Sequence, residues 1–185
     1  MKFLKFFIII FISLTSSIKA DLNKNLINQL KDGGKLIFIR HAYAPGNGDP
    51  NNFNLNDCST QRNLNSIGQK QAKDIGEFFR GNKIKIYKVL SSEWCRCKET
   101  ADIAFKDFST NSFLNSFYSP KYKKNKYKQI EELNNYVKKF KSNKNLIFVT
   151  HYVLISEVLN YGPSSGEIVV SDNNFNIVGT LEIDY

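Results

Sequence analysis

Hydrophobic positions in this chain form two kinds of pattern, short continuous runs and amphipathic stretches. Two of the continuous runs are nearly identical: residues 36–41 are LIFIRH and residues 146–151 are LIFVTH. Short runs rich in β-branched and aromatic residues are typical of buried strands. The chain has only two histidines, so each histidine is predicted to follow directly after a buried strand.

Amphipathic stretches alternate with the predicted strands. Apolar residues at helical spacing predict helices over about 66–80, from near Trp94, over 130–140 and over 153–159. Further strands are predicted over 84–90, 167–171 and 175–183, and residues 113–117 are either a strand or an extended loop. Strands that alternate with helices are typical of an α/β fold. We predict a three-layer sandwich with a mostly parallel central sheet, covered by helices on both faces.

The first twenty residues have the organisation of a secretory signal peptide: a basic start, an apolar run and small residues at the end. The apolar run is too short for a membrane-spanning helix. Cleavage is expected after Ala20 or after Ser17, and an uncleaved anchor at a membrane interface is the alternative. The predicted organisation is a signal peptide over 1–20 and a single domain over 21–185, and the expected location is periplasmic or secreted.

The length of the chain limits the number of domains, and its net charge indicates the kind of partner. A chain of 185 residues is long enough for one hydrophobic core and too short for two ordinary domains. Loss of the signal peptide removes three lysines and lowers the net charge from +9 to +6, which favours anionic partners. The basic stretch Lys121–Lys128 is expected to be a solvated surface or to hold an acidic substrate. Nucleic-acid binders show a denser basic face, so we expect no nucleic-acid partner and no membrane contact after signal cleavage.

Three cysteines follow the predicted secretion signal, which permits a disulfide. Cys95 and Cys97 are too close in sequence to pair easily with each other on a helix. Cys58 is therefore expected to pair with one of them, leaving the other as a buried thiol. The spacing of cysteines and histidines does not match a zinc site, so no metal and no other cofactor is expected.

Three segments carry residues suited to bind a phosphoryl group. In Arg40–His41, a guanidinium offers planar donors for phosphoryl oxygens, and a neutral imidazole can attack phosphorus. In the segment SSEWCRCKETA (91–101), Arg96 would lie on the first turn of a helix, where free backbone N–H groups also favour anions. The second imidazole, in Thr150–His151, again follows a strand. Because ligands bind beyond the carboxyl ends of strands in α/β sheets, these side chains are predicted to meet at one site.

This ordered set of motifs resembles the histidine phosphatase superfamily, also called phosphoglycerate-mutase-like. The order of the motifs matches the first branch of this superfamily, over roughly residues 35–170: a strand with RH, a strand with SSxxxRxxxTA and a late strand with histidine. An L-x-x-x-G-x-x-Q-A segment also matches, at Leu64, Gly68, Gln71 and Ala72. The long loop is similar to that of secreted members, at Ala44, Pro45, Gly46, Asp49, Pro50, Asp57, Gln61, Arg62 and Asn63.

The resemblance implies a histidine acid phosphatase-type hydrolase that acts through a phosphohistidine intermediate on a small or envelope-associated phosphate ester. The catalytic histidines would be His41, as the nucleophile, and His151. Arg40 and Arg96 would hold the phosphoryl oxygens with His151, and no metal would be needed because the arginines supply the positive field. The alternative is a non-catalytic module of the same fold that binds phosphate or a phosphorylated glycan.

One part of the family pattern is missing. Many first-branch members carry a glutamate as general acid where this chain has LNSFY over residues 114–118, and the second branch carries an aspartate where this chain has Tyr152. The candidate general acids are therefore Asp49, Asp57 and Glu93. Alternatively, the leaving group departs without strong proton assistance, as from a phosphohistidine or an acyl phosphate.

Overall fold

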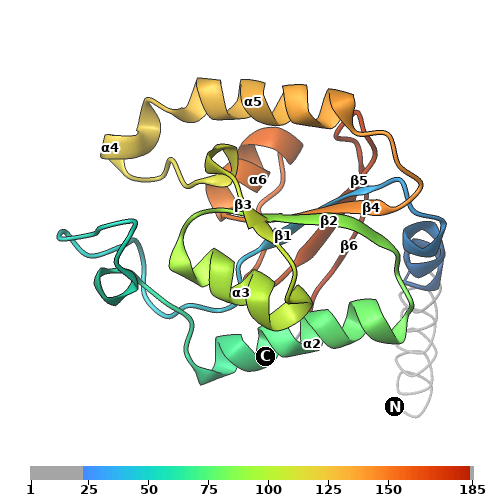
Figure 1. The fold of residues 1–185 in the computed structure, drawn as a ribbon, viewed down its shortest axis with the longest axis horizontal. Helices are drawn as coiled ribbons and strands as arrows, with labels where there is room; N and C mark the ends of the chain where they lie inside the picture. Colours follow the sequence, from blue (N-terminus) through green and yellow to red (C-terminus); the bar gives the residue numbers. More distant parts are fainter. Residues whose placement is uncertain (1–22, 184–185) are drawn as a thin grey trace, which may run out of the picture.

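A six-stranded sheet forms the middle layer of the protein, with helices on both of its faces (Figure 1). The structure is a computed structural model in which residues 23–183 are described, so the predicted signal peptide lies outside the described residues. The strand order is β3-β2-β4-β1-β5-β6. The strands are β1 (Leu36–Arg40), β2 (Ile86–Ser91), β3 (Ser109–Thr110), β4 (Asn145–Thr150), β5 (Ile168–Ser171) and β6 (Ile177–Leu181).

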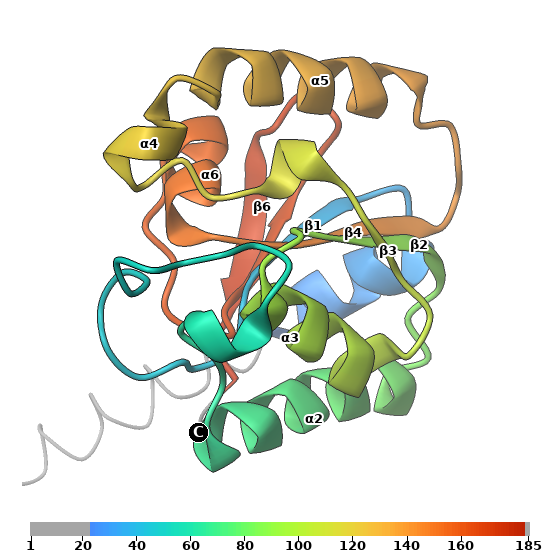
Figure 2. The ribbon, with the colours of Figure 1, turned by 60° about the vertical axis from the view of Figure 1, so that its left-hand side comes forward.

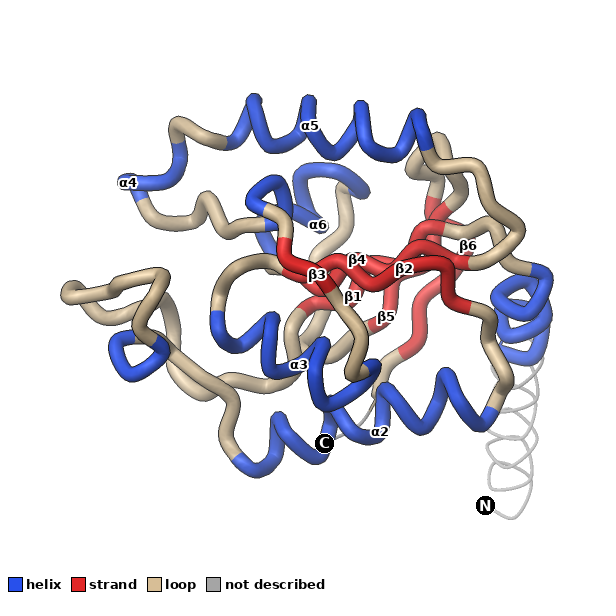
Figure 3. Tube along the Cα trace, in the orientation of Figure 1, coloured by secondary structure: helices blue, strands red, loops and turns tan. Residues whose placement is uncertain are grey.

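The first four strands in this order pair in parallel, whereas β5 and β6 join in antiparallel fashion. Residues 23–32 are helical, and they pack with α2 (Ser66–Gly81) and α3 (Cys95–Phe105) against one face of the sheet. The helices α5 (Lys126–Lys139) and α6 (Tyr152–Leu159) cover the other face (Figure 3). The predicted α/β sandwich with a mostly parallel sheet is confirmed.

The two similar apolar runs lie side by side as β1 and β4, in register. Their apolar residues are all fully buried, as expected for parallel strands with helices on both faces. Alternate side chains enter the two opposite core layers. The register pairs Leu36 with Leu146, Ile37 with Ile147, Phe38 with Phe148, Ile39 with Val149 and Arg40 with Thr150. The histidine that follows each strand therefore emerges at the same edge of the sheet.

A long irregular segment, residues 42–65, and the short helix α4 (Pro120–Lys123) lie at the same end of the molecule (Figures 1 and 2). The segment contains one 3-10 turn, Cys58–Thr60, which the side chain of Asp57 caps by accepting the N–H of Ser59. The other connections between elements are shorter, so this segment is the main irregular part of the described chain.

One of the two alternatives for residues 113–117, the strand, is wrong, and one helix was not predicted. Residues 112–114 form a 3-10 turn rather than a strand, because the Asn111 side chain accepts the N–H of Phe113 and so starts a tight turn. The turn buries Phe113 and Leu114 against the α5 layer. The helix of residues 23–32 was not predicted. None of the helices in residues 23–183 is long and apolar enough to cross a membrane.

Candidate active site

The strand ends bring both histidines and one arginine together. His41 follows β1, His151 follows β4, and Arg96 lies on the first turn of α3, which follows the neighbouring strand β2. The two imidazole centroids are 5.6 Å apart, and Arg96 Nε donates a hydrogen bond to His41 Nε2 at 3.2 Å. All three side chains are almost completely buried. The fold thus gathers these three residues at the carboxyl ends of the strands, where α/β sheets bind their ligands.

The hydrogen bonds of His41 determine which of its ring nitrogens carries the proton. Nδ1 lies 2.9 Å from the carbonyl oxygen of Ala42, which can only accept, so Nδ1 donates. Nε2 accepts from Arg96 and therefore presents a lone pair. Burial, together with the positive charge of Arg96, holds the pKa of His41 well below its ordinary value of 6.5. His41 is thus a neutral imidazole with an unprotonated Nε2, the form that can act as a nucleophile.

His151 is oriented by a chain of polar side chains. Its Nε2 lies 2.8 Å from Ser92 Oγ, and this hydroxyl donates to Asn115 Oδ1 at 3.1 Å. The amide of Asn115 is in turn fixed because its Nδ2 donates to a carboxylate oxygen of Glu93. Ser92 Oγ therefore accepts from His151 Nε2, which fixes the tautomer of the ring. Burial and the charge of Arg96 lower the pKa of His151 well below its ordinary value, so this ring is also neutral.

Two further arginines lie in the same region. Arg40 is half-buried at the end of β1, where its Nη1 donates to the carbonyl oxygen of Pro163 at 2.8 Å and its guanidinium lies 5.5 Å from the centre of the Tyr152 ring. Arg62 donates to the carbonyl oxygens of Gly48 and Ala44, so its side chain links two parts of the long loop 42–65. Burial and the nearby Arg96 lower the pKa of Arg62 to about 10, which still leaves it charged near neutral pH.

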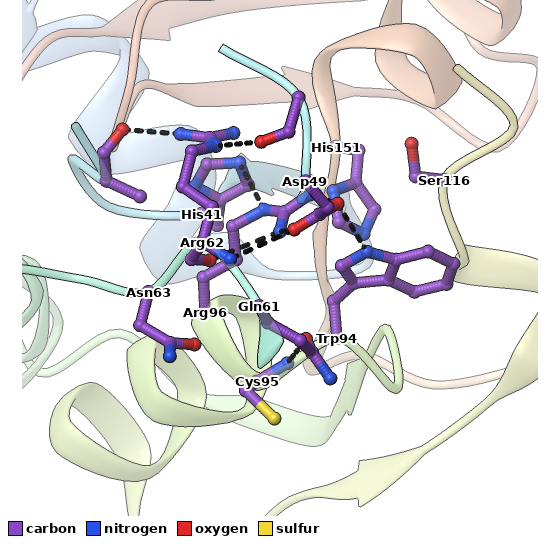
Figure 4. A network of polar contacts seen from close by, with 12 residues as sticks. His41, Asp49, Gln61, Arg62, Asn63, Trp94, Cys95, Arg96, Ser116 and His151 are labelled. Carbon is purple, nitrogen blue, oxygen red and sulfur yellow. Dashed lines mark hydrogen bonds and ion pairs between the residues drawn. The ribbon is translucent and has the colours of Figure 1, made fainter. Parts of the chain in front are cut away.

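These groups line one cavity of about 330 Å³. Figure 4 shows His41, His151, Arg62 and Arg96 from close by, with Asp49 and Trp94 beside them. The cavity is cationic, because four positively charged side chains but only one carboxylate line it among the described residues. Its charged lining is Arg40, Asp49, Arg62, Arg96 and Lys121, and its aromatic lining is Phe53, Trp94, Tyr118, Tyr122 and Tyr152.

The three candidate general acids occupy different places. Asp49 lines the cavity and forms an ion pair with Arg96, with Nη1 to Oδ1 at 2.8 Å. Asp57 is exposed and caps the 3-10 turn through Ser59, away from the residues that line the cavity. Glu93 also lies outside the lining and is the end of the chain that orients His151. The structure therefore brings only Asp49 to the histidines.

The disulfide joins the long loop to the helix that carries Arg96. Cys58 and Cys95 are bonded, with an S–S distance of 2.00 Å, which confirms the predicted pairing of Cys58 with one of the other two cysteines. Cys97 is a buried free thiol, also as predicted. Its Sγ lies 3.5 Å from His151 Nε2, and burial raises its pKa to about 12, so the thiol stays protonated.

Sequence reasoning gave no role to several residues that shape the site. Arg62 and Trp94 stand inside the matched motifs but showed no signal beyond that match. Ser92 belongs to the SSxxxRxxxTA segment, and Asn115 lies where the family's glutamate was sought and not found. Within residues 23–183, no group of three or more histidine, cysteine, aspartate or glutamate side chains is arranged to hold a metal ion.

Comparisons with known proteins find the same fold in solved structures. Three solved structures of the same fold are the protein histidine phosphatase SixA complexed with tungstate and two proteins from Thermus thermophilus, TTHB049 and a phosphoglycerate mutase. Their TM-scores are 0.53, 0.56 and 0.55, at identities of 15%, 16% and 16%. They cover 80%, 81% and 81% of this chain and 96%, 99% and 99% of their own.

No curated protein sequence matches the chain. The model of one protein family does match it, over residues 36–132, which is more than half of the sequence and includes Arg40, His41 and Arg96. This model represents the histidine phosphatase superfamily (branch 1). The chain therefore belongs to the first branch of the histidine phosphatase superfamily.

Proposed function

We propose that this protein is a phosphatase that hydrolyses phosphate monoesters through a phosphohistidine intermediate on His41. The observation that carries the proposal is the unprotonated Nε2 of His41, held beside the Arg96 guanidinium in a cationic cavity. A neutral imidazole next to cationic side chains favours an attack on phosphorus. Membership of the histidine phosphatase superfamily supports the same reaction.

The reaction proceeds in two displacements. His41 Nε2 attacks phosphorus, the bond from phosphorus to the ester oxygen breaks, and the ester oxygen leaves as an anion that takes a proton from solvent water. The Nδ1–H bond to the carbonyl of Ala42 stabilises the positive charge that the ring acquires. Water then attacks phosphorus, the P–N bond breaks, and orthophosphate leaves while His41 returns to its neutral form. Arg40 and Arg96 stabilise the charge on the phosphoryl oxygens in both steps. The neutral His151 ring, whose Nε2–H is donated to Ser92, lines the cavity beside them.

The cavity favours a compact substrate. A volume of about 330 Å³ holds a phosphoryl group and a ring-sized substituent, whereas a folded protein domain would have to stay outside. Exposed aromatic rings of Tyr118 and Tyr152 and the ammonium group of Lys121 lie around the phosphate-binding groups. We therefore propose a small phosphate ester, or a phosphorylated group at the end of an envelope glycan, as the substrate.

The disulfide supports the proposed location. Cys58 and Cys95 are joined, and disulfides persist in oxidising compartments such as the bacterial periplasm or the outside of the cell. Together with the signal-peptide pattern of residues 1–20, this supports a periplasmic or secreted phosphatase.

A second candidate function is a phosphate-binding module without turnover. It is favoured by the lack of a protonated carboxyl group in the cavity, because Asp49 is the one carboxyl among the described lining residues and its pKa lies below the ordinary value. A poor leaving group such as a sugar alkoxide needs proton transfer, whereas an aryl oxide does not.

The test compares the wild type with His41→Ala on an aryl phosphate and on sugar phosphates. The phosphatase proposal expects turnover of the aryl phosphate and a loss of at least about a thousandfold in the variant. Circular dichroism and the melting temperature show whether the variant is folded, and His41→Gln serves as a second variant. Turnover that survives both substitutions contradicts the proposal. Phosphate that raises the melting temperature without turnover of any ester favours the binding module.

A further inference from the structure

Asp49 holds one end of the Arg96 guanidinium inside the cavity. Its Oδ1 accepts from Arg96 Nη1 at 2.8 Å and its Oδ2 accepts from Nη2 at 3.3 Å. Two more hydrogen bonds come from the backbone N–H of Arg62, at 3.1 Å, and from Trp94 Nε1, at 3.0 Å. Four donors therefore converge on this carboxylate (Figure 4), which lies 47 residues from Arg96 along the chain.

The opposite edge of the same guanidinium faces the proposed nucleophile. Arg96 Nε donates to His41 Nε2 at 3.2 Å. The N–H groups of arginine lie in one plane and point along two usable edges. A carboxylate that binds the two Nη atoms end-on leaves the Nε edge for a second acceptor. Asp49 and a phosphoryl group on His41 would thus use different edges, and Asp49 can stay in place when the phosphoryl group arrives.

We propose that Asp49 is a positioning residue, which holds Arg96 at the angle where its Nε edge meets the phosphoryl group on His41. The inference rests on the proposed phosphatase function. The side chains of Arg96 and Asp49 are 4% and 17% exposed, so the pair is shielded from competition by water. Arginine has a long side chain with many rotamers, and fixing it before the substrate binds removes an entropic cost from the reaction.

The same contacts distinguish this role from that of a general acid. Burial alone raises the pKa of Asp49. The hydrogen bonds from Arg96, Arg62 and Trp94 and the charge of Arg96 outweigh burial and lower the pKa below 3.8. Asp49 is therefore ionised near neutral pH. An ionised carboxylate accepts hydrogen bonds and has no proton to give to a leaving group.

The test is the kinetics of Asp49→Asn, which keeps the shape of the side chain but removes its charge and one acceptor. We expect kcat to fall about 10- to 100-fold and KM to change less than about threefold, because the arginine acts mainly on charge that develops in the transition state. The matched control is Asp102→Asn on the same helix, whose exposed side chain pairs with Lys106. It should change neither constant.

A double-mutant cycle tests whether Asp49 acts through Arg96. In an Arg96→Ala background, Asp49→Asn should change kcat less than about twofold, because the group that it positions is absent. A full 10- to 100-fold loss in that background would mean that Asp49 acts by itself, and would overturn the inference. A gain of activity in the single variant would also overturn it, since Asp49 would then compete with the substrate for Arg96.

The pKa of His41 gives a readout that needs no turnover. The chain has two histidines, so NMR titration resolves two imidazoles, which His151→Gln assigns. Arg96 lowers the pKa of His41, and loss of the Asp49 charge by itself would lower that pKa further. A raised His41 pKa in Asp49→Asn therefore reports a displaced Arg96, and the His41 pKa should stay unchanged in Asp102→Asn. A wild type that turns over the aryl phosphate, together with an unchanged His41 pKa and kcat in Asp49→Asn, contradicts the positioning role alone. A raised pKa in a protein without any turnover contradicts the phosphatase proposal alone.

Discussion

The two sides of the site are built in different ways. On the strand side, His41 and His151 follow two parallel strands that pair in register and are buried in both core layers. On the loop side, Asp49 and Arg62 belong to an irregular segment that is held by hydrogen bonds, one ion pair and a disulfide. Regular pairing fixes the histidines as part of the fold, whereas the loop side depends on a few polar contacts, a disulfide and the packing of Phe53 and Leu55.

Because of this difference, we expect changes on the strand side to lower the stability of the protein and changes on the loop side to lower mainly its activity. Damage to the strand side should unfold the whole protein, because the histidines share their backbone with the core. Damage to the loop side should change the orientation of Arg96 while the sheet stays intact. Matched substitutions on the two sides test whether stability and activity separate in this way.

The largest expected effect is on the strand side, for Phe148→Ala. The Phe148 ring is fully buried and lies 4.9 Å from the Phe38 ring across the paired strands. Its removal should lower the free energy of unfolding by about 3–5 kcal/mol, as measured by urea denaturation. The matched loop-side change is Phe53→Ala, whose half-buried ring stacks on Trp94 at 5.2 Å. We expect a smaller loss of stability for Phe53→Ala, and equal losses would contradict the comparison.

The next effect concerns the disulfide on the loop side. Cys58 and Cys95 are 37 residues apart, and a disulfide over such a loop stabilises the folded state by about 2–4 kcal/mol. The double variant Cys58→Ser/Cys95→Ser should melt at a lower temperature and lose activity, because Cys95 precedes Arg96. Its far-UV circular dichroism should match that of the wild type. A reducing agent should affect the wild type and not the double variant, and a wild type unchanged by complete reduction would argue against this role.

The third effect is the dependence of stability on pH. The folded-state pKa values of His41 and His151 lie well below 6.5, so the unfolded chain binds more protons below about pH 6.5. Stability should fall as the pH falls below this value, by about 1.4 kcal/mol per pH unit for each imidazole. The carboxyl of Asp49, with its pKa lowered from 3.8, stabilises the fold above that value and loses its contribution only in stronger acid.

Urea denaturation between pH 7.5 and 5 measures this dependence. His41→Gln should reduce the slope by about half, since one of the two buried imidazoles is gone. A slope that is the same in the variant and the wild type would show that the imidazoles do not set the pH dependence in this range.

The strand side could be predicted from the sequence because burial on both faces leaves a plain signal. The runs LIFIRH and LIFVTH are continuous and similar, and the rule that ligands bind at strand ends places their histidines together. The helix of residues 23–32 escaped prediction because its buried apolar positions are essentially Leu26 and Leu30, too few to form a clear stripe.

The loop side could not be predicted in the same way. The contact between Asp49 and Arg96 joins an irregular backbone to a helix 47 residues away, and no periodicity marks it. The orientation of the Asn115 side chain depends on three hydrogen bonds with Ser92 and Glu93, which lie more than 20 residues away along the chain. Such contacts follow from the folded geometry, so the sequence suggested Asp49 as a candidate but not the group that it holds.

The most direct test of the account is to trap the enzyme during turnover of an aryl phosphate. The enzyme is denatured in alkali, and the phosphorylated residue is located by mass spectrometry. We predict one phosphoryl group on His41, attached at Nε2, that is stable in base and lost in acid, and that is not formed by His41→Ala. Phosphate on another residue, or steady turnover without any phosphoenzyme in the wild type, would contradict the account.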